Sequence, residues 1–203
     1  MYRIVRFSLF LLMQAVPVLG DPSDLCLTAA RQTASEFGVP PQILISLTLT
    51  ETGRTLNGDL RPWPWAINHA GTGHWFETKD QAITFAQDLV QRGQRNFDMG
   101  CFQVNYRWHG DQFPSLEAAF SPDLNARYAA GYLHSLYQDA GNWVLAAAYY
   151  HSRTPEYRDR YLARFETILA TIQDAPQPIK PVSWFASTGA TRLGSLVVLG
   201  GHD

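Results

Sequence analysis

Charged residues are scarce in this chain of 203 residues: Asp, Glu, Lys and Arg together make up 17% of it, against 46% of hydrophobic residues. This balance excludes a disordered chain, which needs the opposite composition, and it supplies enough apolar side chains for a packed core. The formal net charge is −2, and no cluster of Lys and Arg marks a face that binds nucleic acid. We therefore expect one globular domain that has no nucleic-acid partner.

Long apolar runs are also missing, with one exception at the amino terminus. Residues 7–18 are apolar apart from three positions, follow Arg3 and Arg6, and lead to small residues just before Asp21. The run is too short for a comfortable membrane span, and the whole pattern is typical of a cleavable secretory signal. An uncleaved amphipathic anchor is the alternative. We predict a signal peptide over residues 1–20 and a mature chain in the periplasm.

Cysteine is limited to two residues, Cys26 and Cys101. In an oxidising compartment such a pair usually closes into a disulfide, and two separate buried thiols are the alternative. A bridge between them ties the first predicted helix to the segment around Gly100.

Apolar residues at helical spacing predict a mainly α domain over residues 21–173, with one small extended patch. The predicted helices cover Asp21 to Phe37, Pro41 to Gly53, the stretch after the Thr78 capping box, Ser121 to Gly141, Asn142 to His151, and a last helix from Thr154. Alternation of apolar and polar residues predicts extended structure from Asn96 to Tyr106. Residues 55–77 lack any period and predict a long loop, whose Trp63 and Trp65 either stack sugar rings or pack the loop onto the domain.

The composition changes from Asp174 onward, where prolines are followed by a stretch rich in Gly, Ser and Ala. Residues 174–203 are therefore interpreted as a flexible tail behind a semi-rigid linker. The tail contains an apolar patch, Leu193 to Leu199, which either docks on a partner protein or belongs to a disordered end.

Glu51 is the leading candidate for chemistry. It lies on the last turn of a predicted helix that has Pro41 at its first position and Gly53 just past its end. Glu51 follows Leu47 by four residues, so it shares the apolar face, where its charged form is disfavoured and its pKa should rise. A carboxylic acid that stays protonated near neutral pH is what a glycosidase-type general acid requires. The alternative is a side chain that frays into solvent at the helix end.

Three short segments carry a family resemblance. They are Glu51-Thr-Gly, Gly100-Cys-Phe-Gln and Ala147-Ala-Tyr-Tyr, in that order. Together they resemble the soluble lytic transglycosylases, relatives of goose-type lysozyme, whose motifs run Glu-Ser-Gly, Gly-Leu-Met-Gln and Ala-Tyr-Asn. The resemblance covers the chain from Cys26 to Leu169 and implies a lysozyme-like fold.

By this resemblance Glu51 matches the lone catalytic acid, Gln103 matches a glutamine lining the sugar cleft, and Tyr149 matches a tyrosine whose hydroxyl points towards the acid. The chain departs from the pattern at Thr52, where serine is usual, and at Tyr150, where asparagine is usual. The family Leu–Met pair is replaced by Cys and Phe. The residues expected to bind substrate are Gln103, Tyr149, Tyr150, Thr52 and Asn105.

The resemblance implies cleavage of peptidoglycan glycan strands by one carboxylate, without metal or cofactor. Glu51 protonates the glycosidic oxygen between N-acetylmuramic acid and N-acetylglucosamine, then acts as base while the muramoyl 6-hydroxyl closes a 1,6-anhydro ring. A hydrolase of the same fold needs a second carboxylate, for which Asp98 and Glu77 are the candidates, although strand geometry favours surface or hydrogen-bonding roles for both. A weakly catalytic wall-binding assembly module is the other alternative. Compact members of the family suggest, by analogy, a flagellar or secretion component as the partner of the tail.

Overall fold

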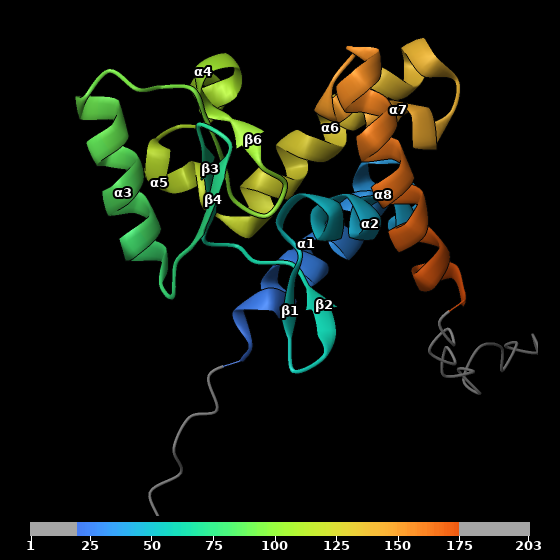
Figure 1. The fold of residues 1–203 in the computed structure, drawn as a ribbon, viewed down its shortest axis with the longest axis horizontal. Coiled ribbons are helices and arrows are strands. Elements are labelled where there is room, and N and C mark those ends of the chain that lie inside the picture. The colour runs from blue at the N-terminus through green and yellow to red at the C-terminus, as the bar shows by residue number, and fades with distance from the viewer. Residues whose placement is uncertain (1–19, 175–203) are drawn as a thin grey trace, which may run out of the picture.

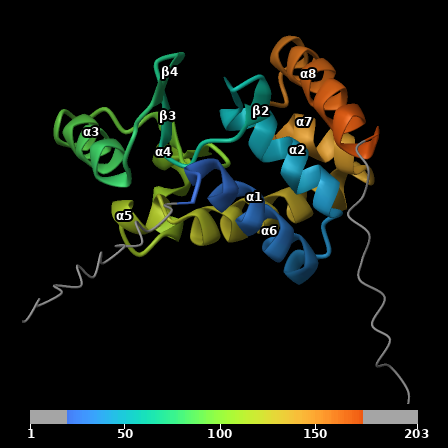
Figure 2. The same ribbon diagram turned by 90° about the horizontal axis from the view of Figure 1, so that it is seen from below.

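The computed structural model describes residues 20–174 (Figures 1 and 2). The elements in chain order are α1 (Pro22–Phe37), α2 (Pro41–Thr52), β1 (Arg54–Leu56), β2 (Asp59–Arg61), β3 (Ala66–His69), β4 (Thr72–Trp75), α3 (Lys79–Gln91), β5 (Phe97–Met99), β6 (Val104–Asn105), α4 (Tyr106–His109), η1 (Gly110–Gln112), α5 (Leu116–Ala119), α6 (Pro122–Ala140), α7 (Trp143–His151) and α8 (Pro155–Asp174). The predicted signal peptide, up to residue 19, and the tail from residue 175 lie outside the described residues. Of the helices between residues 20 and 174, none combines the length and the apolar character that a membrane span requires.

One lobe of the molecule is formed by helices α1, α2, α6, α7 and α8. Helix α1 packs against α2 and α6, and α7 and α8 complete the bundle around α2, which is apolar on nearly all sides (Figures 1 and 2). Local signals set the helix ends: the side chain of Asp21 caps α1 at its start, and Gly38 ends it in the left-handed conformation with φ 64°. A capping box opens α3, where the Thr78 hydroxyl and the Gln81 amide each accept a backbone N–H. The mainly helical prediction is confirmed.

The second lobe is built on a four-stranded antiparallel sheet of order β4-β3-β5-β6, next to α3 and α5 (Figure 1). Strand β5 alternates as predicted, because Phe97 and Met99 are buried in the core while Asp98 faces the other side. Asp98 pairs with Asn68 of β3 and Asn105 of β6. The pairing therefore gathers three polar side chains on one face of the sheet.

The prediction of a structureless loop over residues 55–77 is wrong. The segment contains most of the β1–β2 hairpin and all of the β3–β4 hairpin. Its strands have three or four residues each, too few to display an alternation. Asn57 and Gly58 turn the first hairpin with positive φ, as do Ala70 and Gly71 in the second, and an Ala-Gly pair is a weaker turn signal than Asn-Gly.

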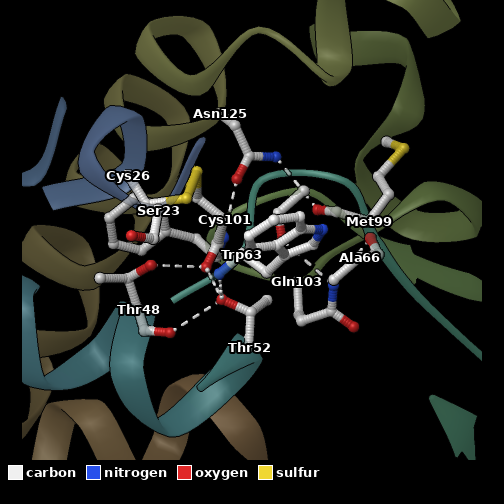
Figure 3. The surroundings of a disulfide bond; sticks show 12 residues. Ser23, Cys26, Thr48, Thr52, Trp63, Ala66, Met99, Cys101, Gln103 and Asn125 are labelled. Carbon is white, nitrogen blue, oxygen red and sulfur yellow. Dashed lines mark hydrogen bonds between the residues drawn. A yellow bond between two sulfur atoms is a disulfide. The ribbon is translucent and has the colours of Figure 1, made fainter. Parts of the chain in front are cut away.

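Cys26 of α1 and Cys101 form a disulfide across 75 positions of sequence, with a Cα–Cα distance of 5.5 Å (Figure 3). The predicted pairing is confirmed, and the alternative of two separate thiols is wrong. The carbonyl oxygen of Cys101 accepts the hydroxyl of Thr48 at 2.8 Å and lies 3.3 Å from the hydroxyl of Thr52, both from α2 (Figure 3). The turn between β5 and β6 is thereby fastened to two helices of the other lobe.

Asn125 of α6 holds the same turn from the opposite side. Its Oδ1 accepts the N–H of Phe102 at 2.9 Å, and its Nδ2 donates to the carbonyls of Met99 and Ala119, both at 3.1 Å. Gly100 is required here, because its φ is 77° and a Cβ would lie 2.7 Å from Asn125 Nδ2. This fully buried amide fixes the backbone that leads to Gln103 (Figure 3).

Candidate active site

Glu51 lies on the last turn of helix α2, at the junction of two cavities between the lobes. The first cavity has a volume of about 300 Å³ and the second about 290 Å³. Four residues line both of them: Glu51, Asp98, Gln103 and His151. Helix α2 stops after Thr52, because Gly53 leaves the helical conformation with ψ 126°. A Cβ on Gly53 would lie 2.2 Å from the carbonyl oxygen of Leu49, so the position has no room for a side chain.

Burial raises the pKa of Glu51 from its ordinary value of 4.5 to about 8. A hydrogen bond from Tyr161 opposes the rise, the negative charge of Asp98 adds to it, and the positive charge of Arg164 opposes it. Glu51 keeps part of its surface open to the cavities. The predicted direction of the pKa is confirmed, and the alternative of a side chain frayed into solvent is wrong. Glu51 is a carboxylic acid at neutral pH and has a proton to donate.

Tyr161 of α8 orients this acid. Its hydroxyl donates a hydrogen bond of 2.7 Å to Glu51 Oε1. Its ring stacks on His151 with centroids 4.5 Å apart and an angle of 9° between the planes. Sequence reasoning predicted the last helix but missed this role of Tyr161, because its partner lies 110 residues away. The helical spacing of apolar residues was the one sequence signal that the side chain of Tyr161 points into the protein.

Asp98, one of the two candidates for a second carboxylate, lines the same two cavities as Glu51. Its Oδ1 accepts the amide of Asn105 at 2.8 Å, and its Oδ2 lies 3.4 Å from the amide of Asn68. Burial raises the pKa of Asp98, and these two hydrogen bonds counteract the rise. The hydrogen-bonding role is confirmed, whereas a purely surface role is wrong. Glu77, the other candidate, is exposed at the start of α3 and lines neither cavity.

Gln103 and Asn105 both face the site. Gln103 has a φ of 47°, and its Nε2 donates to the carbonyls of Ala66 at 3.2 Å and Gly100 at 3.1 Å, so its carboxamide is locked across the turn (Figure 3). Asn105 lines the first cavity, donates to Asp98, and caps α4 by accepting the N–H of Arg107. Both positions agree with the residues expected to bind substrate.

Two residues that were expected to contact substrate do not line the cavities. The hydroxyl of Thr52 is buried, lies 3.0 Å from the carbonyl of Thr48 and accepts the N–H of Trp63 at 3.1 Å, so it braces the fold behind the site. Tyr149 lines neither cavity, and the guanidinium of Arg153 covers its ring at 4.8 Å. The tyrosine hydroxyl that reaches the carboxylate belongs to Tyr161 instead.

Tyr150, rather than Tyr149, faces the site. It lines the first cavity, and its hydroxyl donates to the carbonyl of Phe102 at 2.9 Å. Burial, with the nearby charge of Glu51, raises the pKa of Tyr150 well above its ordinary value, so it stays neutral. Tyr128 and Tyr132 of α6 extend this wall, and the Tyr128 hydroxyl lies 2.6 Å from Nδ1 of His109.

The tryptophans divide into packed and exposed groups. Trp63 is buried and donates its indole N–H to the carbonyl of Phe76, and Trp65 packs half-buried against the core, so the packing alternative is correct for both. Trp75 and Trp108 are 44% and 68% exposed, and each lines one of the two cavities.

No family model, no curated protein and no solved structure matches this chain. Between residues 20 and 174, no group of three or more His, Cys, Asp and Glu side chains is arranged to hold a metal ion.

Proposed function

We propose that this protein is a peptidoglycan lytic transglycosylase with a lysozyme-like fold, secreted to the periplasm. The observation that carries the proposal is Glu51, an acid with a pKa of about 8 placed between two lobes where two cavities meet. A general acid works best when its pKa lies near the ambient pH, because it is then protonated and still gives up its proton readily. The three sequence motifs add independent support for the glycan as substrate.

The reaction needs Glu51 twice. The acid donates its proton to the glycosidic oxygen as the bond to the muramoyl anomeric carbon breaks, and the resulting carboxylate then accepts the proton of the 6-hydroxyl. That hydroxyl oxygen bonds to the same anomeric carbon and closes the 1,6-anhydro ring. Tyr161 supports both states, since its hydroxyl donates to either form of the carboxyl group. Gln103 lies along the glycan path with its amide fixed by backbone carbonyls.

Hydrolysis is the second candidate function, and the position of Asp98 favours it. Two carboxyl groups lining the same cavity are the basic equipment of glycosidases that use water. Two amides donate hydrogen bonds to Asp98 and oppose the rise of its pKa that burial causes. Its ionised form is the one that can support positive charge at the anomeric carbon. In the transglycosylase Asp98 has this electrostatic role alone.

Mass spectrometry of the soluble products distinguishes the two reactions. The chain from Asp21 onward, incubated with purified peptidoglycan, is expected to release muropeptides one water lighter than hydrolytic products. Ordinary reducing ends would assign the protein to the hydrolases, with Asp98 as the assisting carboxylate. Absence of any release would return the assignment to a wall-binding assembly module. The partner of the tail, a flagellar or secretion component, stays a prediction because residues 175–203 lie outside the described structure.

The pH dependence of the rate is expected to move in opposite directions in two variants. Asp98→Asn removes a negative charge that raises the pKa of Glu51, so the decline of kcat/KM at alkaline pH should begin at a lower pH. Tyr161→Phe removes a hydrogen bond that stabilises the carboxylate, so the decline should begin at a higher pH. Initial rates of peptidoglycan solubilisation across the neutral and alkaline range measure both. Arg153→Gln, at a residue that lines neither cavity, is the control. Shifts of the same sign in the Asp98 and Tyr161 variants would contradict the assignment of Glu51 as the general acid.

A further inference from the structure

The two cavities diverge from Glu51 and reach different exposed tryptophans. Trp108 lines the first cavity and not the second, whereas Trp75 lines the second and not the first. Large exposed aromatic side chains cost free energy in water and frequently mark binding surfaces. Here each of them lines a different cavity, and Glu51 lines both cavities.

The indole of Trp75 is held in place before any ligand arrives. Its Nε1 donates to the carbonyl of Thr52 at 3.1 Å, which ties it to the residue after Glu51. Its ring lies close over Gly73, where a Cβ would be 2.7 Å from Cη2. The backbone is fixed as well, because Trp75 pairs with Ala66 in the β3–β4 hairpin. Such an indole gains binding energy without losing conformational freedom on contact.

Trp108 is held by its backbone and by a neighbouring cation. The backbone N–H of Trp108 donates to the Oδ1 of Asn105 at 3.3 Å, which fixes the start of the short helix α4. The guanidinium of Arg107 lies 4.8 Å from the centre of its ring. Although the cation contacts one face of the ring, Trp108 is 68% exposed and lines the first cavity.

We propose that Trp75 and Trp108 are stacking platforms for sugar rings on opposite sides of the bond that Glu51 protonates, and that the site therefore cleaves within glycan strands. The C–H faces of pyranose rings are apolar and flat, so an indole is a suitable surface for them. A site that takes a single terminal unit on one side has no use for a platform on both. This inference rests on the proposed function and adds to it the length and position of the substrate.

Binding is tested in the Glu51→Gln background, where the strand stays intact. Glycan strands freed of stem peptides are titrated into the secreted chain, and affinity is measured calorimetrically. Trp75→Ala and Trp108→Ala are each expected to weaken binding about tenfold, and the double variant about a hundredfold, because distant contacts add. Gly73→Ala, which displaces the Trp75 indole without removing it, should reproduce Trp75→Ala in direction. Tyr157→Ala removes an equally exposed ring outside both cavities and should change nothing.

Affinity within twofold of the Glu51→Gln parent in either tryptophan variant would overturn the assignment of that platform, as would the absence of any glycan binding by the parent. Cleavage within strands is tested with the active chain on glycan labelled at one end. Long unlabelled fragments should appear from the first time points, whereas release of disaccharides alone would overturn it. If the fragments carry ordinary reducing ends while the tryptophan variants still bind weakly, the proposed transglycosylase reaction is overturned and the stacking platforms are retained.

Discussion

Glu51→Gln is expected to lower the rate of glycan cleavage about 10³-fold, the usual contribution of a general acid. Glutamine has the size of glutamate and its carbonyl accepts the hydrogen bond of Tyr161, so the site keeps its shape and loses its proton. The measurement is the initial rate of muropeptide release from purified peptidoglycan. Glu77→Gln, at an exposed position outside both cavities, is the matched control and should retain the full rate.

The same variant is expected to be more stable than the parent at alkaline pH. Because the folded pKa of Glu51 is about 8 and the ordinary value is 4.5, the unfolded chain loses this proton first as pH rises. The stability of the parent therefore decreases between these two values, and the decrease is complete above pH 8. Glutamine has no proton to lose, so the variant should gain about 1–2 kcal/mol at alkaline pH, after discounting for partial exposure, and nothing in acid.

Urea unfolding at acidic and at alkaline pH measures this difference directly. An equal difference between variant and parent at both pH values would contradict the raised pKa of Glu51. Loss of activity with a pH-dependent gain in stability identifies a residue retained for chemistry at the expense of the fold.

Replacing both cysteines by alanine is expected to reduce the free energy of unfolding by about 4 kcal/mol, because the bridge closes a loop of 75 positions in the unfolded chain. Both residues are fully buried, so some of the loss also comes from missing contacts. Urea unfolding of the double variant measures it. Reduction of the parent should shift its unfolding towards the urea concentration of the double variant, and the variant should not respond to reductant. An unchanged unfolding midpoint would contradict a stabilising role for the bridge.

Local signals predicted many of the helices. Asp21, Pro41, Thr78 and Asn142 each sit at the start of a helix that the structure contains, since capping and proline preferences act within one turn. Glu51 could be found for the same reason: its helix, its end at Gly53 and its apolar face are encoded within a dozen residues.

Features that depend on distant parts of the chain could not be found in this way. Adjacent helical residues point about 100° apart, and the Ala-Ala-Tyr-Tyr motif does not say whether Tyr149 or Tyr150 faces the cleft. The tyrosine against the acid comes from another helix altogether, at Tyr161. Asp98 enters the site because β5 pairs with β3 and β6, and that register is set by tertiary packing.

The carbonyl of Cys101 joins the two sides of the candidate active site. The hydroxyls of Thr48 and Thr52 fasten helix α2 to the turn that ends at Gln103, with the disulfide and Asn125 bracing the same turn. Glu51 and Gln103 come from different lobes, yet they belong to one stiff unit. We therefore expect the opening between them to keep its width when a ligand binds. Under the proposed function, such an opening is expected to select by cross-section, admitting a lone glycan strand and rejecting a cross-linked sheet.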